Sequence, residues 1–283
     1  MSGLRIIVLL VLAAGLSPAA DLLGEAVPAG PGLILFSSNR SGPWHIWSVR
    51  PDGSDLKELT KGGADDNDVD PVFSPDAKSV LFSSTRGGKT GVWRMAADGS
   101  KMLRVGDGDQ AEWSPDGRRI AFRRSEAIFV RDLDTGQEKG ITPAGFPHCS
   151  GPSWSPDGKT VAFACRWDAG NALFVVPADG GEPTKVYGEQ GACEPHWSPD
   201  GKRLVYETET HVATVQPDGK GNRLVTTFGG VQRYPRWSPD GKSIVFCQGA
   251  SERGPWEIYT IPADGGRPVR VTEEGSDMTP DWR

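Results

Sequence analysis

The sequence predicts an all-β protein, a six-bladed β-propeller built from four-stranded antiparallel blades. Three observations predict this fold: a hexad that recurs at a nearly fixed interval, four short β-type segments inside each interval, and two chain ends that complement each other. A repeat of about 40 residues cannot bury both faces of its own sheet. Six such repeats arranged radially can, and a propeller is that arrangement.

The recurring hexad is Trp-Ser-Pro-Asp-Gly followed by Lys or Arg. Full copies begin at Trp113, Trp154, Trp197 and Trp237, and a degraded copy, Phe73 to Lys78, precedes them. Successive anchors lie 40, 41, 43 and 40 residues apart, and Pro280-Asp281-Trp282-Arg283 restarts the unit 45 residues after Trp237. Ser-Pro-Asp-Gly favours a tight hairpin turn, because proline presets φ and glycine accepts positive φ. Ala77 stands where that glycine is needed, so we expect a strained turn there.

Each repeat holds four β-type segments, which the fifth repeat shows at 195–198, 203–207, 212–216 and 222–226. The second segment is rich in β-branched and aromatic residues in every repeat, which is typical of strands. It lies at Leu33–Phe36, Ser79–Phe82, Arg119–Phe122, Thr160–Phe163, Arg203–Tyr206 and Ser243–Phe246. A turn of the Asp-Gly type separates the third and fourth segments. Each repeat is therefore predicted to be an antiparallel meander.

The two ends of the repeat region complement each other. The first repeat begins directly at its second segment, Leu33–Phe36, with no hexad before it, and the last four residues supply the missing first strand. A blade assembled from both ends closes the ring and leaves no open sheet edge. The propeller is therefore expected to span residues 32–283.

The N-terminal residues have the pattern of an export signal. Arg5 precedes the apolar run Ile6–Leu16, and Ser17-Pro18-Ala19 offers small residues for cleavage. We expect a signal peptide at 1–19, a short linker at 20–31 and a soluble protein that is periplasmic or secreted. The apolar run is too short to span a bilayer comfortably, and an uncleaved membrane anchor is the alternative.

The charge balance limits the classes of partner. The formal net charge is −6 and the pI is about 5.3. Nucleic acid and anionic membrane surfaces are therefore poor partners, and a cationic ligand or a basic peptide is a better one.

Several of these motifs together resemble the TolB-type propeller repeat. They are Pro-x-Trp-Ser-Pro-Asp-Gly-Lys, a Ser-x-Arg-Gly loop at Ser38–Gly42 and Ser84–Gly87, and Leu59-Thr60. The resemblance covers nearly all of residues 32–283 and implies the fold. For function it implies a cell-envelope scaffold that holds partner proteins, although similar repeats also occur in propeller domains of peptidases and in oligogalacturonate lyases. We expect the protein to lack the separate N-terminal domain of TolB, and no Gly-x-Ser-x-Gly motif supports serine hydrolysis.

The expected binding face is the one that carries the variable loops, and its loops are acidic. Candidate residues at the funnel mouth are Asp66, Asp68, Asp70, Asp277 and Glu194. Asp68 and Asp277 each stand three residues before a proline, in neighbouring blades. These carboxylates are either solvated loop residues or a mouth that takes a basic peptide, and Asp66, Asp68 and Asp70 are also candidate ligands for Ca²⁺. Pro71 stands where an EF-hand needs glycine, so an EF-hand is excluded.

Two tryptophans are further candidates on this face. Trp44 and Trp256 both follow Gly-Pro and precede a third strand, in two blades that the ring makes neighbours. They either pack between blades or form an aromatic shelf beside the mouth.

The four cysteines allow disulfides in an exported chain. Counting from the turn at Asp157-Gly158 brings Cys165 opposite roughly residue 150, which makes Cys149 and Cys165 the candidate disulfide, with Cys193 as a competitor for Cys149. The same region suggests a zinc site from His148 and His196 with Cys149 and Cys193, although the spacings are not those of zinc motifs.

These observations lead to one expected function and one alternative. The expected function is a non-catalytic, monomeric, exported propeller that binds an envelope protein or basic peptide at an acidic funnel, without a cofactor other than a possible Ca²⁺ ion. The alternative is a metal-dependent carbohydrate-active enzyme, a lyase or lactonase, with its site in the funnel.

Overall fold

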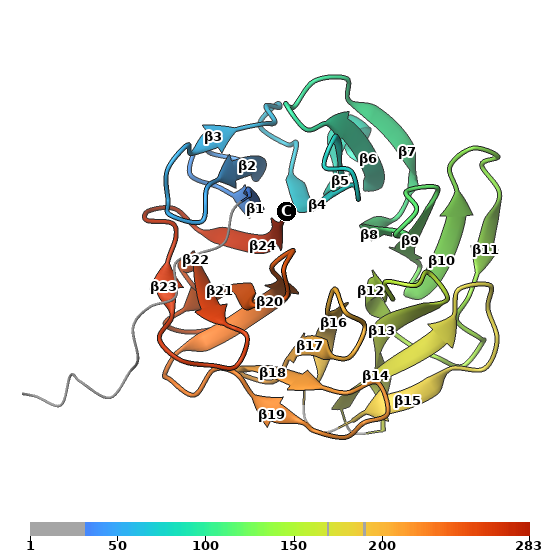
Figure 1. Cartoon of the computed structure of the whole chain (residues 1–283). Helices are drawn as coiled ribbons and strands as arrows, with labels where there is room; N and C mark the ends of the chain where they lie inside the picture. Colours follow the sequence, from blue (N-terminus) through green and yellow to red (C-terminus); the bar gives the residue numbers. More distant parts are fainter. Residues whose placement is uncertain (1–31, 169, 189–190) are drawn as a thin grey trace, which may run out of the picture.

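The fold is seen in a computed structural model that describes residues 32–168, 170–188 and 191–283. Six separate four-stranded antiparallel sheets are arranged around one axis, so the predicted six-bladed propeller is confirmed. Figure 1 looks along this axis, with β4, β8, β12, β16, β20 and β24 nearest the centre. We number the blades 1 to 6 in chain order, beginning with the blade that contains β1.

Blades 1 to 3 are built from three sets of four strands. Blade 1 has β24 (Asp277–Trp282), β1 (Ile34–Ser38), β2 (His45–Val49) and β3 (Lys57–Glu58); blade 2 has β4 (Asp68–Phe73), β5 (Ser79–Ser84), β6 (Gly91–Ala96) and β7 (Leu103–Asp107); blade 3 has β8 (Asp109–Trp113), β9 (Arg119–Arg124), β10 (Ala127–Asp132) and β11 (Glu138–Gly140). A 3-10 turn, η1 (Arg86–Gly88), lies between β5 and β6.

Blades 4 to 6 repeat this order. Blade 4 has β12 (Ser150–Trp154), β13 (Thr160–Trp167), β14 (Gly170–Pro177) and β15 (Thr184–Tyr187); blade 5 has β16 (Cys193–Trp197), β17 (Leu204–Glu207), β18 (Val212–Val215) and β19 (Arg223–Leu224); blade 6 has β20 (Val231–Trp237), β21 (Ser243–Gly249), β22 (Trp256–Pro262) and β23 (Val269–Arg270).

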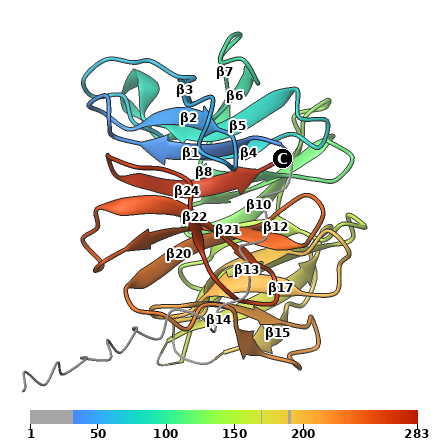
Figure 2. The same cartoon turned by 60° about the vertical axis from the view of Figure 1, so that its left-hand side comes forward.

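The C-terminal strand closes the ring as the sequence predicts. β24 pairs with β1 in antiparallel register, with Ile34 opposite Trp282, and the two strands lie side by side in Figure 2. Leu33 and Arg283 exchange both backbone hydrogen bonds, at 2.5 and 2.9 Å. Trp282 is buried among residues of blades 6 and 1.

The turn that joins the first two strands of a blade has the same structure in all five copies. In the copy of blade 5, the Ser198 hydroxyl donates to Asp200, and the Lys202 backbone N–H donates to the same oxygen. The last residue of the turn has φ near +69° where it is glycine, as at Gly117, and +56° where it is Ala77. The expectation of a strained turn in blade 2 is therefore confirmed by the backbone.

Ala77→Gly is expected to stabilise the protein by about 1 kcal/mol, because an L-residue pays a steric cost in the left-handed region. Urea denaturation measures the change. Gly117→Ala, the same exchange in blade 3, is the matched control and should lose a similar amount. A neutral result for both variants would contradict the argument from backbone strain.

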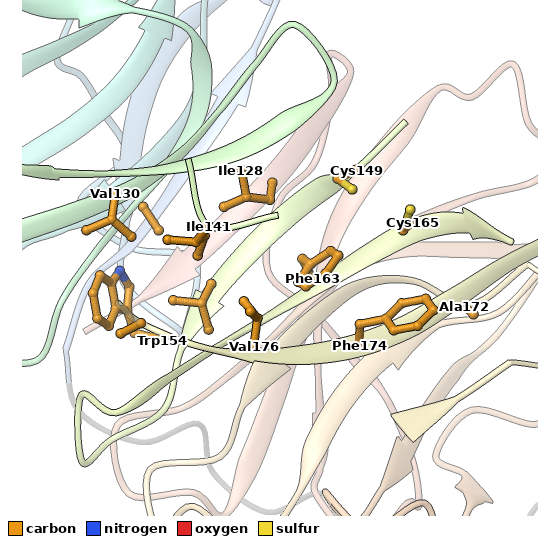
Figure 3. Close-up of a cluster of buried hydrophobic side chains, with 13 residues drawn as sticks. Ile128, Val130, Ile141, Cys149, Trp154, Phe163, Cys165, Ala172, Phe174 and Val176 are labelled. Carbon is orange, nitrogen blue, oxygen red and sulfur yellow. The ribbon is translucent and has the colours of Figure 1, made fainter. Parts of the chain in front are cut away.

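The hydrophobic core lies between blades. Figure 3 shows one cluster, in which Ile128, Val130 and Ile141 of blade 3 face Trp154 and Phe163 of blade 4. Similar clusters fill the other junctions. Blades therefore stabilise one another through their faces, as repeat architectures require.

Two further expectations concern the chain outside the propeller. The predicted signal peptide at 1–19 and the whole of the predicted linker at 20–31 lie outside the described residues. Among the residues that are described, no helix is long and apolar enough to cross a membrane.

Candidate functional site

A ring of six backbone bulges surrounds the propeller axis. Each innermost strand carries one residue in the left-handed region, with φ between +48° and +58°, at Asp70, Gln110, Gly151, Glu194, Tyr234 and Thr279. At each of these points the pairing with the next strand shifts register. Five of the six are not glycine, so the surrounding structure must hold them in an unfavourable conformation. Such positions are frequent at functional sites.

The backbone N–H groups of these residues lock neighbouring blades together. Asp70 donates to the Ser37 hydroxyl of blade 1 at 3.2 Å, and Tyr234 of blade 6 donates to Glu207 of blade 5 at 3.0 Å. Gln110 donates in the same way to Ser83 of blade 2. All six bulged residues line one cavity on the axis.

Two carboxylates lie at the bulges of opposite blades, Asp70 in blade 2 and Glu194 in blade 5. Both line an axial cavity of about 30 Å³, which has room for one or two water molecules. Asp70 accepts from the Ser83 hydroxyl at 3.1 Å, and Glu194 accepts from the Gln110 amide at 3.4 Å. Within the described residues, neither carboxylate has an ion-pair partner within 4 Å.

Gly151 makes room for Glu194 on the axis. A Cβ atom added at Gly151 would lie 2.9 Å from a carboxylate oxygen of Glu194, and its φ is +58°. Only glycine fits here without displacing that carboxylate. The Gly151 N–H donates to the Gln110 side chain, whose amide group also holds Glu194.

An ion pair between opposite blades lies next along the axis, toward the Ser-Pro-Asp-Gly turns. Glu112 of blade 3 and Arg236 of blade 6 approach to 3.1 Å, two residues after the bulges of their strands. Beyond them, on the turn side, lies a separate cavity of about 240 Å³ lined by His196, Trp197 and Trp282, among others. The ion pair therefore separates the axial carboxylates from the turn face.

Burial raises the pKa values of the axial carboxyl groups. The pKa of Asp70 is raised to about 6 and that of Glu194 to about 7, in both cases chiefly by desolvation, with a neighbouring carboxylate adding to the shift. Glu207, which faces the same region, has its pKa raised to about 8 by burial and by the charge of Glu194. Burial also raises the pKa of Glu112, against the opposing effect of Arg236.

The charges around the axis do not balance. Six carboxyl groups gather there, and among the described residues three guanidinium groups pair with four of them: Arg123 pairs with Asp109, Arg236 pairs with Glu112, and Arg233 is shared between Glu207 and Glu252. Asp70 and Glu194 are the two carboxyl groups left over. At neutral pH such a pair requires protons or a cation from outside.

The protein is expected to become less stable as the pH rises from about 5 to 8.5. A carboxyl group whose pKa is raised on folding binds its proton more tightly in the folded state, so stability is present below the folded pKa and is lost as the pH passes through it. Glu207→Gln should therefore stabilise the protein at pH 8.5 by several kcal/mol, at most about 5 kcal/mol for a pKa raised from 4.5 to about 8 at about 1.4 kcal/mol per pKa unit. At pH 5 the same substitution should change the stability of the protein little.

Thermal and urea unfolding at the two pH values measure this difference. Glu209→Gln, an exposed glutamate two residues away, is the control. A variant at Glu207 that is destabilised at pH 8.5 would contradict the assignment of a buried, unfavourable charge.

The expectation that Asp68 and Asp277 lie exposed at the mouth is wrong. Both side chains are fully buried and ion-paired, Asp68 to Arg86 at 2.6 Å and Asp277 to Arg40 at 2.5 Å. Ser84 also donates to Asp68 at 2.6 Å. These arginines belong to the two Ser-x-Arg-Gly loops, so the loop motif and the aspartate form one structural unit within a blade.

The predicted metal sites are not assembled. Asp68 is occupied by Arg86, Asp70 faces the axis, and Asp66 accepts from the Gly63 N–H, so the three do not share a centre for Ca²⁺. In the part of the chain that the structure describes, no group of three or more His, Cys, Asp or Glu side chains could hold a metal ion.

The predicted zinc residues are also apart. His148 is half-exposed and pairs with Glu126 at 2.8 Å, whereas His196 lines the cavity on the turn side. The candidate disulfide between Cys149 and Cys165 is not present: both are free, buried thiols of one core cluster. The register nevertheless places them opposite each other, since Ser150 pairs with Ala164.

The two candidate tryptophans, Trp44 and Trp256, differ in how deeply they are buried. Trp256 is buried in the cluster between blades 6 and 1, so packing is its role and the shelf is excluded for it. Trp44 is partly exposed, and its backbone carbonyl accepts from the Asp68 N–H at 2.8 Å.

Sequence reasoning missed Gln110, Tyr234, Thr279 and Arg236, which line the axial cavity with Asp70 and Glu194. A signal was present: five of the six axial residues immediately precede the proline of the Pro-x-Trp or Pro-x-Phe motif. The residue before this proline, rather than the residue three before it, faces the axis.

Comparison with known proteins agrees with this architecture. The sequence model of the TolB beta propeller domain matches residues 26–127 and again residues 110–216. No curated protein matches the chain.

Solved structures with a similar fold include TolB from Acinetobacter baumannii, at 20% identity and a TM-score of 0.76, with 89% of this chain covering 66% of that one. The chain thus spans slightly less than two thirds of that TolB. A putative TolB from Agrobacterium tumefaciens has 19% identity and a TM-score of 0.73. The match covers 89% of this chain and 94% of the Agrobacterium chain. An oligogalacturonate lyase in complex with manganese is more distant, at 17% identity and a TM-score of 0.56. The match covers 90% of this chain and 75% of the lyase chain. The family match spans well over half of the sequence, and the chain belongs to the TolB β-propeller family.

Proposed function

We propose that this propeller is an exported, non-catalytic scaffold of the cell envelope that binds a basic segment of a partner protein. The observation that carries the proposal is the pair of axial carboxylates, Asp70 and Glu194, which lack any ion-pair partner among the described residues. A lysine or arginine side chain from a partner would supply the missing positive charge. Charge-assisted hydrogen bonds of this kind are stronger than neutral ones.

The partner would approach from the face of the variable loops. The Glu112–Arg236 pair lies between the axial carboxylates and the turn face, so a side chain entering from the turn face would have to displace it. Breaking a buried ion pair is costly. The loops of the variable face differ in length and sequence from blade to blade, as is common for binding surfaces on a rigid scaffold.

Several sequence features support the envelope location and the class of partner. The N-terminal pattern of Arg5 and an apolar run predicts export, and the net charge of −6 favours a basic partner over nucleic acid. Membership of the TolB β-propeller family supports a scaffold role, since the similar solved structures include two TolB proteins. We expect the chain to act as a monomer.

The enzymatic alternative receives less support. The oligogalacturonate lyase structure is described as a manganese complex, and it matches with a lower TM-score than either TolB structure. The described side chains of this protein include no set of three potential metal ligands.

The test is capture of proteins from an envelope extract of the source organism by the immobilised protein. Asp70→Asn/Glu194→Gln is expected to lower the amount of captured partner at least tenfold at pH 7.5, without loss of stability, because it removes buried charges. Capture by the wild type should also weaken as salt rises from 50 to 300 mM.

Asp65→Asn/Glu274→Gln is the matched control, since both residues are exposed acids in the loops of the same face and make no ion pair with another described residue. It should capture the partner as well as the wild type does. Equal capture by the axial variant and the control would overturn the proposal.

A further inference from the structure

The axial cavity that holds the proposed binding site is small. Its volume is about 30 Å³, and about 10 to 15 Å³ of such space is needed for one water molecule. The cavity therefore has room for roughly two heavy atoms. The ammonium nitrogen of a lysine and the methylene carbon next to it match this space. An arginine guanidinium group, with a carbon atom and three nitrogen atoms in one rigid plane, exceeds it.

Each axial carboxylate keeps one oxygen atom for a ligand. Asp70 accepts from the Ser83 hydroxyl through its Oδ2 atom, and Glu194 accepts from the Gln110 amide through its Oε1 atom. Within the described residues, the Asp70 Oδ1 and Glu194 Oε2 atoms accept no hydrogen bond. A guanidinium group binds most strongly through both oxygens of one carboxylate. An ammonium group is a point charge, and single oxygens of two carboxylates can share it.

A hydroxyl group on the cavity wall completes the set of acceptors. Thr279 and Tyr234 line the cavity, and each carries a hydroxyl group. The Thr279 hydroxyl is held 2.7 Å from the Ser37 hydroxyl, which also accepts from the Asp70 N–H at 3.2 Å. Two carboxylates and one hydroxyl group match the three N–H donors of an ammonium group.

Much of the remaining wall is apolar. Pro71, Pro152 and Pro235 each follow a bulge residue and line the cavity, together with Val72 and Ala111. A guanidinium group has five N–H donors, and those facing these residues would lose water without gaining an acceptor, which is costly. The methylene stem of a lysine packs well against such a surface.

The site is accessible from solvent. Asp70, Glu194 and Thr279 are each only partly buried. On the turn side, the ion pair between Glu112 and Arg236 closes the axis. A side chain that arrives from the variable loops therefore meets the two carboxylates before it meets this pair.

We propose that the axial site selects a primary ammonium group, and that the partner inserts a lysine side chain into it rather than an arginine. This inference rests on the proposed function and narrows the basic segment of the partner to one kind of residue. The N-terminal amine of a protein carries the same charge, but its nitrogen is attached to a branched carbon atom, which is wider than the stem of a lysine. The small cavity is therefore assigned to the lysine side chain.

The test uses three libraries of synthetic nine-residue peptides on the full-length protein at pH 7.5. Two are acetylated at the N-terminus and have random residues, without lysine or arginine, around a fixed central lysine or a fixed central arginine. The third contains neither residue and has a free N-terminus, which tests the other source of an ammonium group. The peptide that binds most tightly is then remade with arginine or with Nε-trimethyl-lysine at its centre, and calorimetry measures the affinities.

The lysine library is expected to supply the ligands. Arginine at the central position should lower the affinity at least tenfold, because the guanidinium group exceeds the cavity. Trimethyl-lysine keeps the charge but has no N–H donor, and it should also bind at least tenfold more weakly. Asp70→Asn/Glu194→Gln should abolish the preference for lysine.

Enlarging the cavity should relax the selection. Thr279→Gly removes a side chain from the cavity wall, and glycine accepts the φ of +49° at this position. The preference for the lysine peptide over the arginine peptide should then fall below threefold. Ser125→Gly is the matched control, because Ser125 also has a hydroxyl group and a φ of +49° but is exposed between β9 and β10. It should keep the tenfold preference, and an unchanged preference in Thr279→Gly would overturn selection by size.

The remaining outcomes separate this inference from the proposed function. Lysine and arginine peptides of equal affinity, both weakened by Asp70→Asn/Glu194→Gln, would overturn the selectivity and leave the proposed function in place. Ligands from the third library alone would overturn the assignment to lysine. If Asp70→Asn/Glu194→Gln weakened the binding of no peptide from any library, the proposed function would fail together with this inference.

Discussion

A chain that ends at Thr279 is expected to lose cooperative unfolding. The deletion removes Trp282, which is 2% exposed, and the part of the β24–β1 ladder in which Trp282 and Asp281 pair with Ile34 and Leu35. Loss of a buried tryptophan alone costs about 3 to 5 kcal/mol. The Asp281 carboxylate, which accepts from the Phe73 N–H of blade 2 at 2.9 Å, is lost as well. Since domains are stable by about 5 to 15 kcal/mol, these losses together approach the whole stability.

Circular dichroism during urea unfolding measures this effect. The control is a permuted chain in which residues 277–283 precede Leu33 through a Ser-Pro-Asp-Gly turn, which restores the strand with the turn of the other blades. It should unfold cooperatively. A truncated chain within about 1 kcal/mol of the wild type would show that closure by β24 contributes little.

Replacing Asp68 and Asp277 by lysine is the second large effect, and it is expected to unfold the protein at room temperature. Each change removes one partner of a buried ion pair and places a second positive charge beside Arg86 or Arg40. Leaving a buried charge without its partner costs about 3 to 5 kcal/mol at each site. Thermal unfolding of the two single variants and of the double variant measures the losses.

Asp65→Lys/Glu274→Lys gives the same change in net charge at exposed positions and should shift stability by only about 0.5 kcal/mol. If the Asp68/Asp277 variant were equally stable, the two buried ion pairs would not be the structural units described above.

The fold could be predicted because its determinants are local. The hexad at Trp197 fixes a turn, the β-branched segments fix the strands, and the spacing fixes the number of blades. Closure also followed from the sequence, because the missing first strand of blade 1 and the extra Trp282 at the other end have only one consistent pairing.

The site could be predicted only in part because its determinants are not local. A bulge interrupts the alternation of side chains along a strand, so the sequence pattern, which singled out Asp68 with Asp277, did not show that Asp70 rather than Asp68 lines the axis. The charges of Asp68 and Asp277 are visible in the sequence, but the arginines that neutralise them lie in loops 18 and 237 positions away. Asp70 and Glu194 were among the predicted residues, and the structure brings them together because blades 2 and 5 face each other across the ring.

The most direct test of the central claim is the number of protons released when the captured partner binds. At pH 6.5, Asp70 and Glu194, with pKa values of about 6 and about 7, together hold about one proton. A basic side chain bound between them would lower both pKa values and release it. Calorimetric titration in two buffers of different ionisation enthalpy should therefore show release of about one proton at pH 6.5, close to none at pH 9, and none at either pH for Asp70→Asn/Glu194→Gln. Binding that releases no proton at pH 6.5, with an affinity that the double variant leaves unchanged, would contradict a role for the axial carboxylates.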